Sequence, residues 1–91
     1  MATTKLIPSK FTLAGTNWTV RQVEGISELG LCNPETHTIS LRKGMTTQAL
    51  EQTFCHELIH ALMFTAGHTN HDEVFVDSMG SLLHQWLKTK E

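Results

Sequence analysis

The sequence has no tyrosine, only two cysteines and two prolines, and no run of like charges. Seven basic and nine acidic side chains leave a net charge of −2, and Lys and Arg form no block. We therefore expect neither nucleic acid nor an anionic membrane as a partner. No segment reaches the ~20 apolar residues of a membrane span, and residues 1–8 lack the apolar stretch of a signal peptide. These absences predict a soluble protein of the cytoplasm.

Cys32 and Cys55 form no C-x-x-C motif and are too few for a disulfide framework. Two small reduced residues in a reducing compartment are favoured, although the sequence leaves a bond between them open. The length of 91 residues predicts one domain, 1–91. Domains of this size are marginally stable, and they often gain stability from a metal ion.

The pattern of apolar residues predicts an α+β fold, with a small antiparallel or mixed sheet of three to four strands packed on two helices. Four short extended segments are predicted, because they are rich in Phe, Thr, Trp and Val or alternate between apolar and polar residues, and turn residues separate them. These are Lys10–Leu13, Trp18–Val23, Leu29–Cys32 and His37–Leu41.

Two helices follow the strands. The first is expected from Thr46, a suitable N-cap, to about Ala66, with Gly67 beyond its end. The second is expected from about His71 to Lys88. Apolar residues recur in it at helical spacing and are predicted to belong to the core. They are Val74, Met79, Leu82, Leu83 and Trp86.

The first helix contains the motif H-E-x-x-H, with His56, Glu57 and His60. Residues four apart lie on one face of a helix, so two imidazoles at this spacing can bind one zinc ion. Glu57 then lies where a carboxylate can take a proton from a water that the metal activates. The flanking residues are apolar, and burying two histidines and a glutamate among them without partners would cost free energy. The motif therefore predicts a zinc site with Glu57 as general base.

A catalytic zinc site usually has three protein ligands, and His68, His71 and Glu73 are the candidates for the third. If the second helix runs back beside the first, the rise of 1.5 Å per residue brings Glu73 towards the level of His60. We favour Glu73, with His68 as its main rival and His71 as a possible exposed first-turn residue. A capping box from Asn70 to Glu73 would compete for the same carboxylate. Asp77, one turn later, is placed to accept the free N–H of a ligating imidazole.

The segment from Leu29 to Trp86 resembles zincin metallopeptidases. His56-Glu57-x-x-His60 followed by Glu73-x-x-x-Asp77 is similar to the gluzincin pattern, and the second helix resembles that of ImmA/IrrE-type peptidases. The turn and strand from Asn33 to Ile39 resemble those before the zinc helix in ImmA/IrrE-type and SprT-like proteins, and SprT-like proteins use a third histidine. The resemblance implies a substrate-binding edge strand within Thr36–Arg42, formed by Thr36, His37, Thr38, Ile39 and Ser40. In its small size the protein resembles a minimal zincin encoded by a phage or prophage. Such a protein would act in the host cytoplasm.

These features predict a zinc-dependent endopeptidase that binds one zinc ion per chain and acts on a protein or peptide. The alternative is a non-catalytic, zinc-stabilised protein-binding module, and a zinc hydrolase for another bond, such as a cell-wall amide, stays open. Two further residues have simpler interpretations. His84 is expected to be a surface or interface histidine, and Gly80 is expected to permit close helix packing. The oligomeric state is not predicted.

Overall fold

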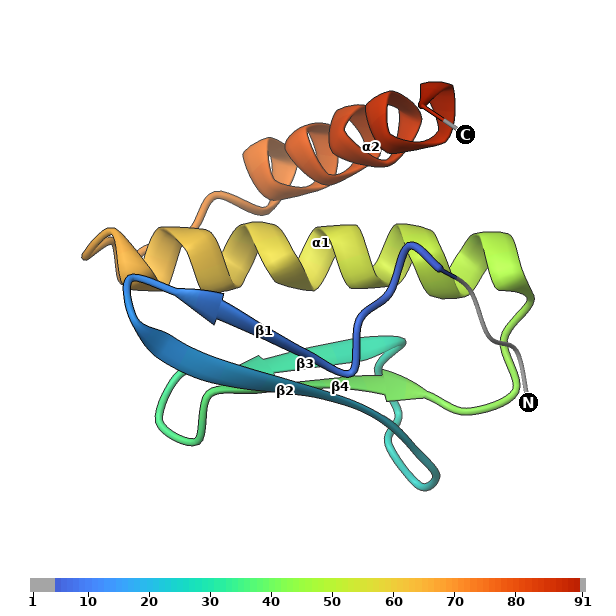
Figure 1. Ribbon diagram of the computed structural model, residues 1–91, viewed down its shortest axis with the longest axis horizontal. Coiled ribbons are helices and arrows are strands. Elements are labelled where there is room, and N and C mark those ends of the chain that lie inside the picture. Colours follow the sequence, from blue (N-terminus) through green and yellow to red (C-terminus); the bar gives the residue numbers. More distant parts are fainter. Residues whose placement is uncertain (1–4, 91) are drawn as a thin grey trace.

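The computed structural model describes residues 5–90, which form a four-stranded sheet and two helices (Figure 1). The sheet has the strand order β1-β2-β4-β3, and only β2 and β4 pair in parallel. The predicted α+β class is confirmed. In chain order the elements are β1 (Lys10–Leu13), β2 (Thr16–Val23), β3 (Gly30–Asn33), β4 (Thr38–Arg42), α1 (Thr47–Thr65) and α2 (Glu73–Thr89).

The first hairpin has a tighter turn than the sequence suggested. Leu13 pairs with Thr16, so only Ala14 and Gly15 connect β1 to β2. Both have positive φ, 49° and 81°, which matches the twist of a two-residue hairpin. The second strand consequently begins at Thr16 and not at Trp18.

β4 lies inside the sheet, between β2 and β3. The prediction that Thr36, His37, Thr38, Ile39 and Ser40 form an edge strand is therefore wrong. Alternation of apolar residues predicts a strand but does not reveal whether one or two neighbours pair with it. His37 lies in the turn before β4 with φ 52°, and its ring meets Trp18 edge-on at 5.3 Å between centroids. The edge strands of the sheet are β1 and β3.

α1 packs between the sheet and α2, as Figure 1 shows. The side of α1 that faces the sheet contributes Leu50 and Phe54 to a core that also contains Trp18, Ile39 and Leu41. Its N-terminus is capped as predicted, because the Thr46 side chain accepts a hydrogen bond from the Ala49 N–H at 3.2 Å. This sandwiched position accounts for the apolar flanks of the H-E-x-x-H motif.

α2 contacts α1 through a different face from the one predicted. Its buried residues are Val76, Gly80 and His84, spaced four apart along one side of the helix. A Cβ on Gly80 would lie 3.0 Å from the His56 Cα, so the prediction of close helix packing is confirmed. The predicted core membership was wrong for four residues. These are Val74, Met79, Leu82 and Trp86, which are 75%, 39%, 58% and 57% exposed.

His84 was expected at the surface or at an interface, and the surface position is wrong, because the residue is buried where α2 meets α1. Its Nε2 lies 3.0 Å from the Glu51 Oε1, and the Lys88 Nζ lies 3.3 Å from the same oxygen. Glu51 is itself only 2% exposed. A buried carboxylate is tolerated only with such partners, so this cluster joins the start of α1 to the end of α2.

Cys32 and Cys55 are not bonded to each other. Over residues 5–90, neither helix is both long enough and apolar enough to cross a membrane.

Candidate metal centre

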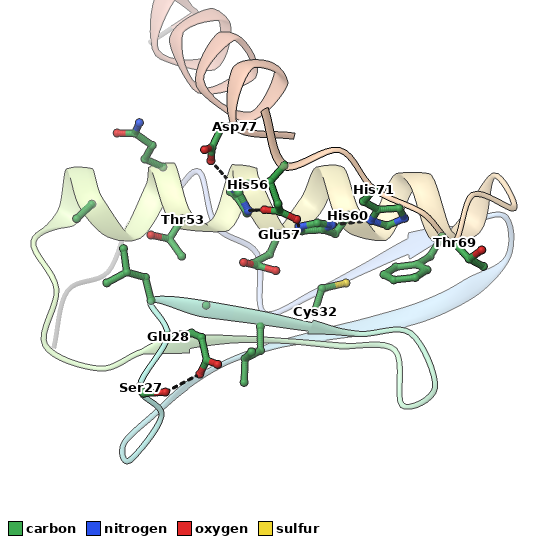
Figure 2. A pocket seen from close by; sticks show the side chains of 17 residues that line it. Ser27, Glu28, Cys32, Thr53, His56, Glu57, His60, Thr69, His71 and Asp77 are labelled. Atoms are coloured by element: carbon green, nitrogen blue, oxygen red, sulfur yellow. Dashed lines mark hydrogen bonds and ion pairs between the residues drawn. The ribbon is translucent and has the colours of Figure 1, made fainter. Parts of the chain in front are cut away.

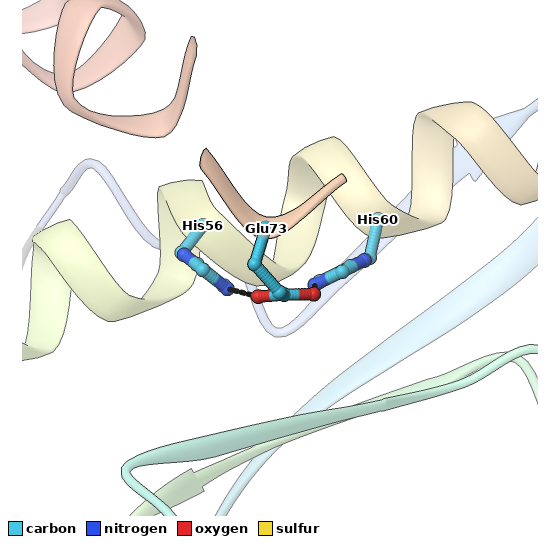
Figure 3. A group of neighbouring side chains, drawn as sticks. All are labelled: His56, His60 and Glu73. Carbon is cyan, nitrogen blue, oxygen red and sulfur yellow. Dashed lines mark ion pairs between the residues drawn. The ribbon is translucent and has the colours of Figure 1, made fainter. Parts of the chain in front are cut away.

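His56 and His60 project from successive turns of α1 towards Glu73, the first residue of α2 (Figure 3). The His56 Nε2 lies 3.4 Å from the Glu73 Oε1, and the His60 Nε2 lies 3.3 Å from the Glu73 Oε2. One potential ligand atom from each residue lies within 4.8 Å of the others. Within residues 5–90, this is the one such group of three or more His, Cys, Asp or Glu side chains.

The Glu73 carboxylate is available because a neighbour caps the helix. Asp72 is the N-cap of α2, and its side chain accepts a hydrogen bond from the Val74 N–H at 2.9 Å. The competing capping box from Asn70 to Glu73 is therefore not the cap that α2 uses.

Asp77 lies where the sequence predicted, beside His56. Its Oδ1 is 2.8 Å from the His56 Nδ1 (Figure 2). A carboxylate accepts hydrogen bonds, so the His56 Nδ1 carries the proton in this contact. In the neutral ring, Nε2 then keeps a lone pair, and that atom faces Glu73.

His71 orients His60 in a similar way. The Nδ1 atoms of the two rings lie 2.6 Å apart, and the rings stack with centroids 4.9 Å apart. The His71 Nε2 lies 2.7 Å from the His68 backbone oxygen. That oxygen can only accept, so the His71 Nε2 donates and its Nδ1 accepts a hydrogen bond from the His60 Nδ1. The His60 Nε2 then also keeps its lone pair.

Three electron-pair donors thus face one another: two imidazole Nε2 atoms and the Glu73 carboxylate. Without a cation between them their contact is repulsive, whereas two imidazoles and one carboxylate are a common ligand set for catalytic zinc. Burial also lowers the pKa of His60, although the charge of Glu73 acts in the opposite direction. The lowered pKa favours the neutral ring, which is the form that binds a metal. The donor set therefore fits a zinc ion.

Glu57 lies below the two histidines, in the space between α1 and β3 (Figure 2). It is 7% exposed, and burial raises its pKa to about 7, with the charge of His56 lowering it and that of Glu73 raising it. Gly30 on β3 permits this placement, because a Cβ there would lie 2.7 Å from the Thr53 Cγ2 and 3.0 Å from the Glu57 Cγ. A carboxyl group with this pKa can exchange a proton near neutral pH.

These side chains border a cleft of about 1000 Å³ between α1, the start of α2 and the strand β3 with its preceding loop. Cys32 on β3 projects into it near Glu57 (Figure 2). Burial and the charge of Glu57 raise the pKa of this thiol to about 12, so it stays protonated at neutral pH.

Sequence reasoning missed three contributors to the site. It took His71 for a candidate ligand or an exposed residue, Cys32 for a simple buried residue, and it gave no role to Gly30. The glycine inside the predicted strand Leu29–Cys32 was a usable signal, since glycine within a strand often marks a close approach of backbone and side chain. The contact between His60 and His71 had no comparable signal, because it depends on the path of residues 66–72.

The family model that matches the chain covers residues 8–88 and describes the SprT-like family. The chain belongs to this family. SprT-like proteins are related to zincin metallopeptidases, which agrees at a coarse level with a zinc-associated peptidase site. Neither the curated proteins nor the solved structures gave a match.

Proposed function

We propose that this protein is a zinc-dependent endopeptidase in which His56, His60 and Glu73 hold one zinc ion per chain. The observation that supports this most is the convergence of two imidazole lone pairs and a carboxylate, each imidazole being oriented from behind by a separate acceptor. The SprT-like family membership supports the same reaction class. Although the resemblance implies a third histidine in SprT-like proteins, in this chain Glu73 is the better placed ligand.

Zinc, when bound, supplies a Lewis acid that makes water nucleophilic at neutral pH and polarises the scissile carbonyl. Glu57 accepts the proton of the attacking water and later delivers it to the leaving amine. Its buried position favours this exchange, because its pKa lies near neutrality. Asp77 and His71 hold the two histidine rings in the tautomer that leaves Nε2 free.

We further propose that the substrate is an extended peptide that pairs with β3. This strand is at the edge of the sheet and borders the cleft beside Glu57. An exposed edge offers backbone N–H and C=O groups to an added strand, a common way of binding peptides. We therefore assign to Gly30–Asn33 the substrate-binding role that the sequence analysis expected of Thr36–Ser40.

The substitution Glu57→Gln tests the catalytic role. It keeps the size of the side chain and removes the base, so zinc content should stay at one per chain while cleavage falls by roughly 10²–10⁴-fold. A peptide-library screen with the parent protein would supply the substrate. Glu35→Gln is the matched control, because Glu35 is exposed in the turn between β3 and β4, outside the cleft.

Equal cleavage by Glu57→Gln and the parent, at equal zinc content, would disprove the role assigned to Glu57. Zinc binding without cleavage of any peptide would favour the non-catalytic, zinc-stabilised binding module instead. A buried carboxyl group with a raised pKa has no use in such a module, and this is why we prefer the peptidase.

A further inference from the structure

One flank of α2 exposes four large apolar side chains, Phe75, Met79, Leu82 and Trp86, which we call the α2 seam. They are 48%, 39%, 58% and 57% exposed. α2 is the outer layer of the molecule and packs mainly on α1 (Figure 1). Lys90 lies over one end of the seam, with its Nζ 4.7 Å from the centroid of the Trp86 ring, and all four side chains still keep a large exposed fraction.

The spacing of the seam is regular. Its members are separated by four, three and four residues, which is the a/d pattern of a coiled-coil heptad. At 3.6 residues per turn they fall within a strip about 60° wide. Val74 is more exposed than any of them, at 75%, but it lies on a different side of the helix. The pattern is that of a helix that packs against another helix.

We propose that the α2 seam pairs with the α2 seam of a second copy of this chain, with the two helices antiparallel. Charge at the two ends of the seam supports this partner and this orientation. Asp72 precedes the seam and Lys90 follows it. Viewed down the helix axis at 100° per residue, both lie on the side of the seam where Met79 lies, about 20° beyond Met79. Antiparallel pairing brings the Asp72 of each copy to the Lys90 of the other, whereas parallel pairing would oppose like charges.

The exposed area is sufficient for a dimer. With ~200 Å² for each large apolar side chain, the exposed fractions leave roughly 400 Å² of apolar surface per chain. Two copies would bury roughly 800 Å², and homodimer interfaces are about 65% apolar, which implies a total of roughly 1,200 Å². That value is at the lower end of stable interfaces, so we expect a dissociation constant in roughly the micromolar range.

The dimer leaves the metal centre accessible. Glu73 and Asp77 point from the other flank of α2 towards His56 and His60. The seam thus lies apart from the cleft, and dimerisation can be tested independently of zinc binding and of cleavage.

Sedimentation velocity from roughly 1 μM to 0.5 mM protein would test the pairing. The parent should change from monomer to dimer over this range. Leu82→Glu places a charge in the centre of the seam and should raise the dissociation constant by at least about 100-fold. Val74→Glu is the matched control: it introduces the same charge on the same helix, outside the seam, and should dimerise like the parent.

Circular dichroism would verify that each variant is folded, and Phe75→Ser provides a milder second variant that should also weaken the dimer. A parent that stays monomeric over the whole range overturns the proposal, and so does a dimer that Leu82→Glu and Phe75→Ser leave intact.

The orientation has its own test. Lys90→Glu should weaken an antiparallel dimer by about tenfold, because acid then meets acid at both ends of the seam. Adding Asp72→Asn, which keeps a good N-cap, removes that repulsion and should recover most of the loss. Lys90→Glu without effect, or without recovery by Asp72→Asn, overturns the antiparallel arrangement.

Discussion

The Nδ1 atoms of His60 and His71 lie 2.6 Å apart, so the ring of a proposed zinc ligand is held by a second histidine. The His71 Nε2 donates to the His68 backbone oxygen at 2.7 Å. The direction of both hydrogen bonds is therefore fixed: His60 donates to His71, and His71 donates to His68. His56 is held in the same sense by Asp77. The two ligands of the H-E-x-x-H motif therefore depend on residues that follow the motif by eleven or more positions.

Removing the acceptor behind His60 should weaken zinc binding. His71→Leu leaves the His60 Nδ1–H without its partner, and we expect zinc affinity to fall by about 10–100-fold, the usual effect of losing such a group. In His71→Asn the side-chain oxygen can accept the same proton, so most of the affinity should return. Competition titration against a chromophoric chelator measures both variants, and equal losses for Asn and Leu would contradict the orienting role.

The third ligand can be identified by a pair of substitutions. Glu73→Ala removes a proposed ligand and should cost more zinc affinity than any change at His68 or His71. His68→Ala keeps the backbone oxygen that accepts from His71, so its affinity should stay close to that of the parent. The same metal titration applies. If His68→Ala were the most damaging change, the third ligand would be a histidine.

The stability of the metal-free protein should report the ionisation of Glu57. Its pKa is raised from 4.5 to about 7 in the folded state, so the folded protein retains a proton that the unfolded chain has lost between these pH values. Stability contributed by the protonated form is therefore lost as pH rises towards 7, by up to about 3 kcal/mol.

The substitution Glu57→Gln isolates this effect, because the histidines titrate in both proteins. The stability advantage of Glu57→Gln should be near zero below pH 4.5 and should grow up to about pH 7. Urea unfolding in the presence of a chelator measures it. An advantage that does not vary with pH would mean that Glu57 has an ordinary pKa.

The packing of α2 on α1 should tolerate no side chain at Gly80. A Cβ there would lie 3.0 Å from the Cα and 3.1 Å from the backbone N of His56, and a backbone cannot move aside as a flexible side chain can. We expect Gly80→Ala to destabilise the fold by about 1–3 kcal/mol despite the better helix propensity of alanine. Thermal unfolding measures the change, with Ser78→Ala on the exposed face as control. A more stable Gly80→Ala would contradict the close packing.

The sequence by itself determined the features that depend on neighbours a few positions away. Alternation located four strands to within about two residues, the Thr46 cap located the start of α1, and the four-residue spacing put His56 and His60 on one helical face. These follow from the periods of helix and strand and from local hydrogen bonds, which no distant segment has to supply. The choice of Glu73 as a partner for both histidines also needed only the helical rise and a short turn.

Only the tertiary structure decided which surfaces are covered. β4 is internal because β3 pairs with one of its edges and β2 with the other. The pairing with β2 joins segments about 20 residues apart, and alternation cannot predict it. α2 buries Val76, Gly80 and His84, not its most regular apolar stripe, because the contact with His56 sets how the helix is rotated on α1. The His71 ring reaches His60 because of the path that residues 66–72 take between the two helices. Such pairings depend on how whole elements pack, and a single sequence contains the periods of its elements but not their mutual rotation.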